Sequence, residues 1–237
     1  MLEIAGLNKT RGQGGDAFSI QLPSLQLAQG QTLAIAGLSG TGKSTLLEMI
    51  GLVLAPHRVE RFQFTPSNSA SSIDIAQLIR DSRQDQLAQI RARHIGFVLQ
   101  TGGLLPFLTV AQNLLLPRQL NGLPPKSALL AELSDALGVT ELMARKPREL
   151  SVGQRQRVAF VRALSHEPSL LLADEPTAAL DPYHGQRLFE KMLDVVGRHQ
   201  VSAIVVTHNE ALIEQFGLPV LRGDHLTGAA GSGAVFG

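Results

Sequence analysis

Cysteine and tryptophan are absent from this 237-residue chain, and there is a single tyrosine. Without cysteine, a disulfide scaffold and cysteine-ligated zinc or iron–sulfur sites are excluded. The chain has 21 Lys and Arg residues and 20 Asp and Glu residues, so its positive and negative charges nearly balance. That balance argues against a protein that neutralises nucleic-acid phosphates, so no nucleic-acid partner is expected. No apolar run approaches the roughly 18 residues that cross a bilayer, and residues 1–4 begin no secretory signal.

Charged residues make up only 17% of the chain, whereas hydrophobic residues make up 44%. This composition supplies ample material for a core and little for a disordered tail. At about 100–200 residues per domain, the length fits one large domain or two small ones. So small a charged fraction indicates that part of the protein surface binds other molecules.

Short apolar runs recur along the chain without the polar alternation of a one-sided sheet. They occupy residues 32–36, 95–99, 170–173 and 203–206. Such runs predict strands buried on both faces, hence a parallel sheet covered by helices. Residues 1–30 instead predict short strands around a turn-rich stretch at 11–15, and residues 104–164 are almost wholly helical in pattern. Residues 228–237 are mostly Gly, Ala and Ser, and we expect them to fray.

A glycine-rich segment follows the first apolar run. Gly37-Leu38-Ser39-Gly40-Thr41-Gly42-Lys43-Ser44 fits the pattern G-x-x-x-x-G-K-[ST], between a predicted strand and a helix predicted over 44–52. The glycines let the backbone wrap around phosphate oxygens, and the N–H groups at the helix start face the negative charge. Lys43 can reach the β- and γ-phosphates, and the Ser44 hydroxyl can ligate Mg²⁺. The alternative is a glycine-rich turn that only caps a helix, and the flanking elements favour the phosphate site.

Two acids, Asp174 and Glu175, end the apolar run at 170–173. In a parallel sheet, ligands bind at the carboxyl ends of the strands. Asp174 would therefore lie next to the phosphate loop, where it can hold Mg²⁺ directly or through water. Glu175 would be placed to polarise a water for in-line attack on the γ-phosphate. An acidic pair at a strand end is also a common solvated turn, and the phosphate loop in the same chain favours the catalytic interpretation.

The segment Leu150-Ser151-Val152-Gly153-Gln154 begins a helix that is predicted to run to about Ala163. Ser151 and Gln154 form an S-x-x-Q capping box, and a capped helix N-terminus is also an anion site. The segment resembles the LSGGQ signature of ATP-binding-cassette (ABC) ATPases, and the resemblance covers nearly the whole chain. The other motifs of the family occur in the family's order. The phosphate loop resembles the Walker A motif, and Gln100 corresponds to the Q-loop glutamine. Asp174-Glu175 corresponds to the Walker B pair, Ala179-Leu180-Asp181 to the D-loop and His208 to the switch histidine.

The resemblance implies an α/β fold with a P-loop NTPase (RecA-like) core. Its sheet is mainly parallel, with an N-terminal antiparallel β subdomain and an inserted α-helical subdomain. Residues 1–237 would form a single ABC ATPase domain. The α/β core would span 1–100 and 165–237, and the helical subdomain with the signature would span 101–164. Two such domains sandwich two ATP molecules head to tail, so each nucleotide touches the phosphate loop of one copy and the signature helix of the other.

The resemblance also implies residue roles. Glu175, His208 and Gln100 are catalytic: Gln100 senses Mg²⁺ and the γ-phosphate, and His208 holds the γ-phosphate or the attacking water. Ser44, Gln100 and Asp174 form the Mg²⁺ site. Asp181 can equally cap a helix before Pro182, and the two roles are compatible. The residues expected to contact ATP are Gly37, Ser39, Gly40, Thr41, Gly42, Lys43, Ser44, Thr45, Arg11, Ser151, Gly153, Gln154 and Asp181.

Residues 104–110, with Asn113 and Leu116-Pro117, are similar to the ATP-binding subunits of lipoprotein-release, macrolide-export and cell-division systems. In those systems a separate membrane protein moves lipophilic cargo or transmits force. The expected partners are therefore a second copy of the chain and an integral-membrane permease, with the chain on the cytoplasmic face of the inner or plasma membrane. The docking surface would include Leu104, Leu105, Phe107 and Leu108, although helix packing explains the same residues.

Three positions depart from the family's pattern. Val152 stands where the signature most often has glycine, and a β-branched residue resists positive φ, so slower activity is expected. Asn209 follows His208 where aspartate is usual. Arg11 lies where an aromatic residue usually stacks on adenine, and Phe18 is the nearest alternative.

Two rivals remain beside a transport ATPase. A regulatory module would signal through a membrane protein by ATP-driven dimerisation without moving cargo, and its motifs are identical. A soluble ABC ATPase that acts on DNA or ribosomes would need a long coiled-coil insertion or two tandem cassettes, and residues 44–150 show no sustained heptads. A P-loop kinase would not need Ser151–Gln154 or His208.

Overall fold

One sheet organises the part of the chain that the computed structural model describes, residues 1–12, 17–228 and 231–237. Its strand order is β5-β4-β1-β2-β10-β9-β3-β8-β7-β6. The turn-rich stretch predicted at 11–15 lies mostly outside the described residues. The strands are β1 (Leu2–Arg11), β2 (Phe18–Leu27), β3 (Thr32–Gly37), β4 (Arg61–Phe64), β5 (Ile73–Asp74), β6 (Ile95–Val98), β7 (Leu170–Asp174), β8 (Ser202–Val206), β9 (Val220–Gly228) and β10 (Gly231–Phe236).

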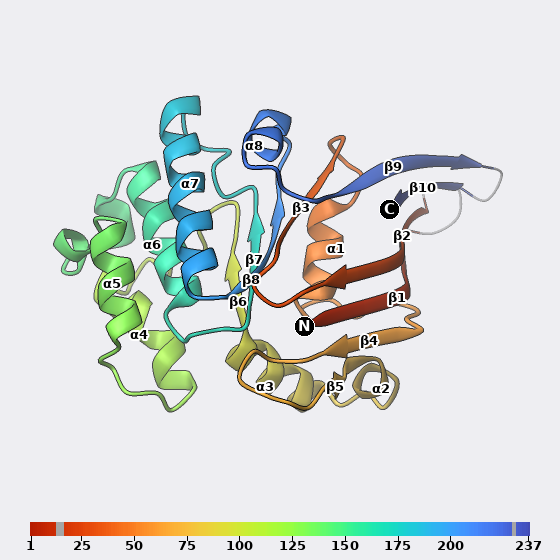
Figure 1. Ribbon diagram of the computed structural model, residues 1–237, viewed down its shortest axis with the longest axis horizontal. Coiled ribbons are helices and arrows are strands. Elements are labelled where there is room, and N and C mark those ends of the chain that lie inside the picture. The colour runs from red at the N-terminus through yellow and green to blue at the C-terminus, as the bar shows by residue number, and fades with distance from the viewer. Residues whose placement is uncertain (13–16, 229–230) are drawn as a thin grey trace.

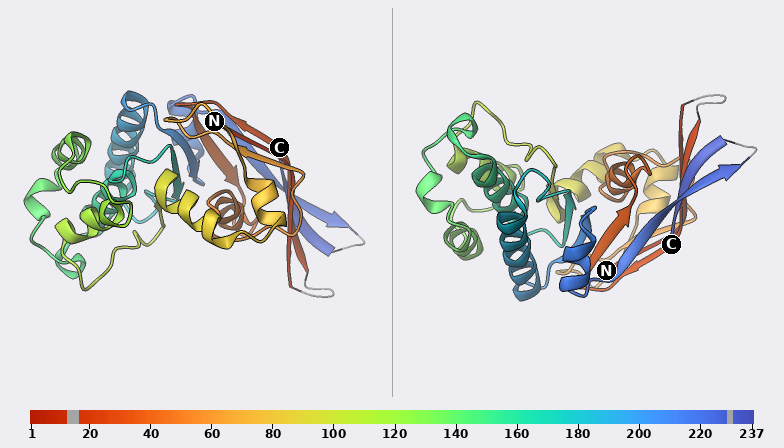
Figure 2. Two further views of the ribbon diagram at one scale, coloured as in Figure 1. Left: turned by 90° about the horizontal axis from the view of Figure 1, so that it is seen from below. Right: turned by 90° about the horizontal axis from the view of Figure 1, so that it is seen from above.

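Helices cover both faces of the parallel half of this sheet. Figures 1 and 2 show α4, α5 and α6 gathered at one end of the molecule and the antiparallel strands at the other. Among the described residues, no helix has both the length and the apolar character that a membrane span requires. The helices are α1 (Lys43–Ile50), α2 (Ile75–Arg80), α3 (Gln84–His94), α4 (Val110–Leu120), α5 (Ala128–Ala136), η2 (Thr140–Leu142), η3 (Pro147–Glu149), α6 (Val152–Leu164), α7 (Pro182–Arg198) and α8 (Glu210–Gln215).

The four apolar runs form the parallel strands β3, β6, β7 and β8, as their lack of alternation predicts. β8 lies between β3 and β7, and β7 lies next to β6. Near the N-terminus, β1 pairs antiparallel with both β2 and β4. The predicted α/β class, with a mainly parallel sheet and N-terminal antiparallel strands, is confirmed.

Successive residues of the parallel strands enter two different cores. Leu170 and Leu172 of β7 pack with α1 and the antiparallel strands on one face. Leu171 and Ala173 pack on the other face with α6 and α7. Because side chains alternate across a strand, a strand with both faces covered must be apolar throughout. Both cores therefore hold the carboxyl ends of the strands in fixed positions.

The expectation that residues 228–237 fray is wrong for the part that the structure describes. Residues 231–236 form β10, which pairs parallel with β2 and antiparallel with β9. The small residues here serve close packing: a Cβ on Gly233 would lie 2.5 Å from the carbonyl oxygen of Ser19. Phe236, near the end of the chain, is fully buried.

Candidate nucleotide-binding site

The carboxyl ends of four parallel strands bring together several of the residues that the sequence singled out. Val206 of β8 lies opposite Ile35 of β3 on one side and Asp174 of β7 on the other. Because neighbouring strands are about 4.8 Å apart, the segments that follow these three strands leave the sheet side by side. These segments carry the phosphate loop after β3, His208 after β8 and Glu175 after β7.

The phosphate loop turns from β3 into α1 through residues that only glycine suits well. Gly40 and Gly42 have φ values of 84° and 87°, and Gly42 is the N-cap of α1. A Cβ on Gly42 would meet Ile20 Cδ1 at 2.5 Å, so the loop packs tightly on β2. The helix begins at Lys43 and ends at Ile50, slightly earlier at each end than the sequence predicts. The backbone N–H groups in the first turn of an α-helix have no partner within the helix, so those of α1 are available to the loop.

Lys43 is buried and folds back over the loop. Its ammonium group donates hydrogen bonds to the carbonyl oxygens of Gly37 and Leu38, both at 2.8 Å. The Thr41 hydroxyl donates to the same Leu38 carbonyl at 2.9 Å. Ser44, one position further along, is exposed at the start of the helix. The loop thus presents a cation and a hydroxyl group next to the backbone N–H groups.

Asp174 and Glu175 have different surroundings at the end of β7. Oδ1 of Asp174 is buried and has no hydrogen-bond partner among the described residues. A buried carboxylate oxygen without a donor is costly, and a bound cation would satisfy it. Ser44 and Asp174 supply the hydroxyl and carboxylate oxygens that Mg²⁺ prefers in phosphate sites, so these residues fit the ion.

Glu175 is held in an unusual conformation against His208. Its φ is 48°, a left-handed value that is uncommon outside glycine. Its N–H donates to the Val206 carbonyl at 3.0 Å, and its Oε2 lies 2.8 Å from Nδ1 of His208. The Glu175 side chain is 14% exposed, whereas that of His208 is 68% exposed. The carboxylate is thus fixed, and the imidazole reaches toward solvent.

Gln100 lies on the loop after β6. Val98 of β6 pairs with Ala173 of β7, so this loop starts beside Asp174 and Glu175. The side chain of Gln100 is exposed, while its carbonyl oxygen accepts a hydrogen bond from Nε2 of Gln156 at 2.9 Å. Sequence reasoning missed Gln156, because its contact is made with a segment 56 residues away.

The segment at the start of α6 forms the predicted capping box. The Ser151 hydroxyl accepts from the N–H of Gln154 at 3.3 Å, and the Gln154 side chain accepts from the N–H of Ser151 at 2.9 Å. Val152 is the first residue of α6 and is absent from the residues with positive φ. The expected conformational conflict at Val152 is therefore wrong, because a helical φ suits a β-branched residue.

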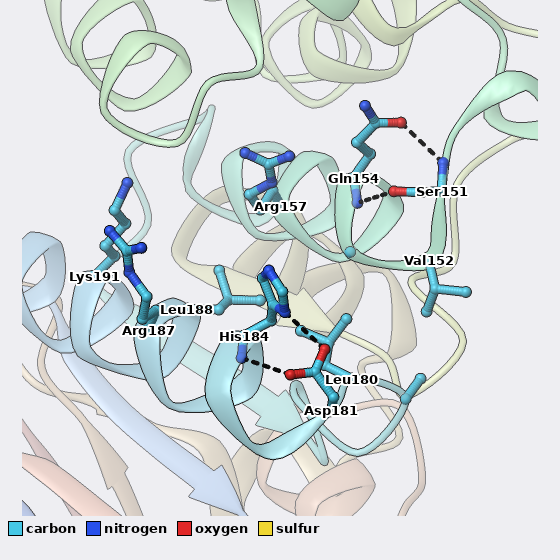
Figure 3. A pocket seen from close by; sticks show the side chains of 12 residues that line it. Ser151, Val152, Gln154, Arg157, Leu180, Asp181, His184, Arg187, Leu188 and Lys191 are labelled. Atoms are coloured by element: carbon cyan, nitrogen blue, oxygen red, sulfur yellow. Dashed lines mark hydrogen bonds and ion pairs between the residues drawn. The ribbon is translucent and has the colours of Figure 1, made fainter.

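A pocket of about 680 Å³ opens beside this segment (Figure 3). One wall is the start of α6, and the other is residues 179–181 with the first turns of α7. Asp181 caps α7 and accepts hydrogen bonds from the backbone N–H and the ring of His184. These bonds hold the pKa of Asp181 below its usual value. The full lining is Ser151, Val152, Gly153, Gln154, Arg157, Ala179, Leu180, Asp181, His184, Arg187, Leu188 and Lys191.

The lining of this pocket carries more positive than negative charge. Arg157, Arg187 and Lys191 face Asp181 as the single acid. A cationic pocket at the N-terminus of a 13-residue helix suits an anion. Sequence reasoning missed Arg187 and Lys191, although their spacing of four residues on one helix places them on the same face. The phosphate loop, which the structure describes in full, is not part of the lining.

Arg11 forms an exposed ion pair with an acid of α1. Its guanidinium is 3.3 Å from a carboxylate oxygen of Glu48, on α1. In the pairing of β1 with β2, Arg11 lies opposite Phe18. A Cβ on Gly42 would lie 3.6 Å from Cε1 of Phe18, so the ring of Phe18 borders the phosphate loop. The adenine contact predicted for Arg11 stays a prediction.

Comparison with known proteins assigns a family to this arrangement. A family model described as ABC transporter matches residues 20–178. The chain is 35% identical over 214 residues to the lipoprotein-releasing system ATP-binding protein LolD of Bacteroides fragilis, with 90% of this chain and 93% of that protein covered. It is 37% identical over 213 residues to the protein of the same name from Ruegeria sp., with 88% of each covered.

Solved structures give the same picture. The ATP-binding cassette MJ0796, described as dimeric in a post-hydrolysis state with ADP and Pi, matches with a TM-score of 0.79 and 30% identity over 94% of each chain. A second dimeric structure of that cassette matches with the same TM-score and identity. The likeness extends over nearly the whole described chain.

Proposed function

The chain belongs to the ABC transporter family, whose members bind and hydrolyse ATP, and we propose that it is the ATP-hydrolysing subunit of a membrane complex. In this proposal, two copies enclose two ATP molecules and drive a separate permease. The observation that carries it is the division of the chain's anion-binding groups between two surfaces. One is the phosphate loop at the sheet edge, and the other is the cationic pocket beside Ser151.

ATP would bind first at the sheet edge. Lys43 would exchange its bonds to the Gly37 and Leu38 carbonyls for phosphate oxygens, and the loop N–H groups would complete the cradle. The residues proposed to contact nucleotide here are Gly37, Ser39, Gly40, Thr41, Gly42, Lys43, Ser44 and Thr45. Binding therefore depends mainly on the triphosphate.

Ser44, Asp174 and Gln100 would hold Mg²⁺, which supplies positive charge to the β- and γ-phosphates when bound. The support is the buried Oδ1 of Asp174, which has no hydrogen-bond partner in the described part of the chain and ends β7, the strand next to β8. Glu175 would take a proton from the attacking water, and its contact with His208 would keep its carboxylate aimed. His208, being exposed, is free to meet the γ-phosphate.

The second copy would complete each site. Ser151, Gly153 and Gln154 would meet the γ-phosphate on the partner's loop, with Asp181 nearby. The capped start of α6 and the three lining cations supply the charge that such a contact needs. The dimeric relatives of known structure support this arrangement.

The permease would dock on an apolar groove of about 420 Å³ between α3, α4 and α6. Leu99 and Leu120 line it and are 44% and 74% exposed, and Phe107, in the segment between β6 and α4, is 68% exposed. Exposed apolar area of this kind marks a protein-binding surface. The LolD relatives are named for lipoprotein release, so we infer a permease that handles lipid-linked cargo. The chain would work at the cytoplasmic face of the membrane as a peripheral subunit.

Substitution of Glu175 tests the catalytic assignment. Glu175→Gln keeps the side-chain shape but cannot take a proton, so kcat should fall by about 10²- to 10⁴-fold while ATP affinity stays within a few fold. With ATP and Mg²⁺, the variant should also accumulate a dimer in size-exclusion chromatography. Glu141→Gln, an exposed position on η2, is the matched control and should behave as wild type. Turnover of Glu175→Gln within about threefold of wild type would refute the assignment.

Substitution in the groove tests the partner. Leu120→Glu in the groove, or Phe107→Glu at the exposed ring between β6 and α4, should abolish recovery of the membrane subunit with the tagged chain from detergent extracts, because a carboxylate buried against the permease without a partner is costly. Leu226→Glu, at an exposed leucine of β9, is the control and should leave recovery unchanged. Equal recovery with all three variants would place the permease elsewhere.

A further inference from the structure

The first turn of α7 carries a carboxylate–imidazole pair at the wall of the cationic pocket. Oδ1 of Asp181 accepts a hydrogen bond from the backbone N–H of His184 at 3.1 Å, and Oδ2 lies 2.7 Å from Nδ1 of the same residue. Since these bonds hold the pKa of Asp181 below its usual value, its carboxylate is ionised at neutral pH and can only accept. Nδ1 therefore carries a hydrogen, and Nε2 is the ring nitrogen left for a ligand.

The His184 ring lies in the pocket beside the start of α6 (Figure 3). The two walls of the pocket are in contact, because a Cβ on Gly153 would lie 3.3 Å from Cδ2 of Leu180. The side chain of His184 is 70% exposed, so a ligand that enters the pocket can reach it. The ring therefore belongs to the same surface as Ser151, on which the proposed function places the partner's γ-phosphate.

Capping of α7 does not account for the ring. The cap needs only Oδ1 of Asp181 and the N–H of residue 184, which any residue but proline would supply. The second bond, from Nδ1 to Oδ2, instead orients an imidazole. A carboxylate behind a histidine fixes its tautomer and stabilises the positive ring that forms when the other nitrogen takes a proton. Such a ring donates from Nε2 to an anion in a charge-assisted bond.

The other groups around the ring prepare the pocket for an anion. Arg157 reaches it from α6, and Arg187 and Lys191 reach it from the following turns of α7. Each of the three donates to a neighbouring oxygen, at 2.8, 3.2 and 3.0 Å respectively, so their positions are fixed. Tyr183 packs edge-on against the imidazole, and Asp181 is the single acid of the lining. An entering phosphate would therefore supply the negative charge that a cationic ring needs among these neighbours.

We propose that Nε2 of His184 binds the γ-phosphate that the second copy presents, and that Asp181 is the positioning residue behind it. The inference rests on the proposed function, because the phosphate arrives only if two copies pair head to tail. It adds a histidine to the groups that meet the γ-phosphate at the start of α6, and it places the ring between Asp181 and the nucleotide. Since the ring donates from Nε2 only when it is charged, closing a site takes up a proton wherever the free ring is neutral.

Dimerisation measures the contact. In the Glu175→Gln background, which should hold the ATP-bound dimer, His184→Ala should raise the dimer dissociation constant by about tenfold for each of the two sites. The ATP affinity of the separate chain should change by less than about twofold, because the phosphate loop is untouched. Gln186→Ala, at an exposed neighbour on α7 outside the pocket, is the matched control and should leave both constants unchanged. A dimer dissociation constant that stays within about threefold in His184→Ala would refute the contact.

Two conservative variants separate binding from structure. Asp181→Asn keeps an oxygen for the N–H of residue 184, so its thermal stability should stay near that of wild type, but the neutral amide no longer stabilises a charged ring. Its dimer should therefore weaken by several fold although the cap remains. His184→Gln keeps a neutral donor and should recover part of the affinity that His184→Ala loses. A loss of thermal stability that parallels the loss of dimerisation would assign both residues to the cap and overturn the proposal.

The pH dependence of dimerisation gives a reading that a structural role would not move. A histidine ordinarily changes charge between about pH 5 and 8, and the dimer holds the proton that the free ring releases. The dimer should therefore weaken as the pH rises from about 6 to about 8, and His184→Gln should weaken by about tenfold less per site. His208 and the ATP phosphates are present in both proteins, so the difference between them reports position 184. Equal pH dependence in the two would refute the proton uptake and the contact with it.

A mixed dimer tests whether the ring acts across the interface. Lys43→Ala damages the phosphate loop of one copy and Ser151→Arg the α6 start of the other. The single intact site then joins the loop of the Ser151→Arg copy to the α6 start of the Lys43→Ala copy. His184→Ala added to the Lys43→Ala copy should lower ATP hydrolysis about tenfold at low protein concentration. The same change in the Ser151→Arg copy removes a ring from the inactive site and should cost at most about twofold.

The outcomes separate this inference from the proposed function. Equal losses with His184→Ala in either copy would overturn the contact across the interface and leave the two-copy ATPase standing. Mixed dimers that form but hydrolyse no ATP even before His184 is changed would overturn the proposed function and the inference with it. A loss confined to the Lys43→Ala copy supports both.

Discussion

His166 should give the chain a pH-dependent stability. The ring follows α6, its Nε2 lies 3.2 Å from the Ile95 carbonyl, and its buried Nδ1 has no partner among the described residues. Burial lowers the pKa of His166 to about 4, and the positive charges of His94, Arg118 and Arg162 act in the same direction. The hydrogen bond to Ile95 opposes the shift. Protonation of this ring is therefore strongly disfavoured in the folded state.

The sign follows from comparing the two states. The unfolded histidine has a pKa of about 6.5, so between that pH and about 4 the unfolded state binds the proton that the folded state refuses. Stability contributed by neutral His166 is present above pH 6.5 and is lost as the pH falls through this window. Linkage gives a loss of about 2 kcal/mol at pH 5 relative to pH 8, or roughly 4–8 °C in Tm.

Urea unfolding at the two pH values measures this loss. His166→Gln keeps an N–H for the Ile95 carbonyl but does not titrate. Between pH 8 and pH 5, the free energy of unfolding should therefore fall by about 2 kcal/mol less in this variant than in wild type. His94, whose pKa is lowered by burial and by Arg93, is present in both proteins. His225→Gln, at an exposed ring of β9, is the control and should fall as wild type does. An equal fall in His166→Gln and wild type would refute the reasoning.

Nucleotide selectivity should be weak, with ATP and GTP competing within about tenfold, because Arg11 stands where an aromatic ring would stack on the base and the triphosphate supplies most of the binding. A preference for ATP above about a hundredfold that is lost in Phe18→Ala would assign the base platform to Phe18. Asp181→Ala should cost about 1 kcal/mol in thermal unfolding through the lost cap of α7, while Asp181→Asn should keep most of it. Val152→Gly should change kcat by less than about threefold, because Val152 already has helical backbone geometry; a tenfold gain would contradict this.

Local patterns predicted the strands and the motif positions well. A phosphate loop, a capping box and an acidic strand end are each encoded within a few residues, so their signals survive without tertiary information. The Ser151–Gln154 box and the Asp181 cap are both present as predicted. The parallel strand arrangement followed from apolar runs, because a strand covered on both faces has no polar face to show.

Contacts between distant segments could not be predicted. The bond from Gln156 to Gln100 joins a helix face to a loop that no local spacing connects. β10 was missed because its residues have low strand propensity, and the sheet stabilises it through backbone pairing with two neighbours. The sequence around Gly223 likewise gave no sign that a glycine is required there, yet a Cβ at this position would lie 2.6 Å from the Phe236 ring. Such close packing is a tertiary property.

Complementation between two inactive variants tests most directly whether each ATP site is built from two copies of the chain. Lys43→Ala damages the phosphate loop and Ser151→Arg damages the signature segment, so a mixed dimer holds one site with both lesions and one with neither. Mixing equal amounts should restore up to about a quarter of the wild-type rate, because about half of the dimers are mixed and each holds one intact site. Two affinity tags, one on each variant, verify that mixed dimers form. Mixed dimers that are recovered in quantity but hydrolyse no ATP above the separate variants would contradict the account.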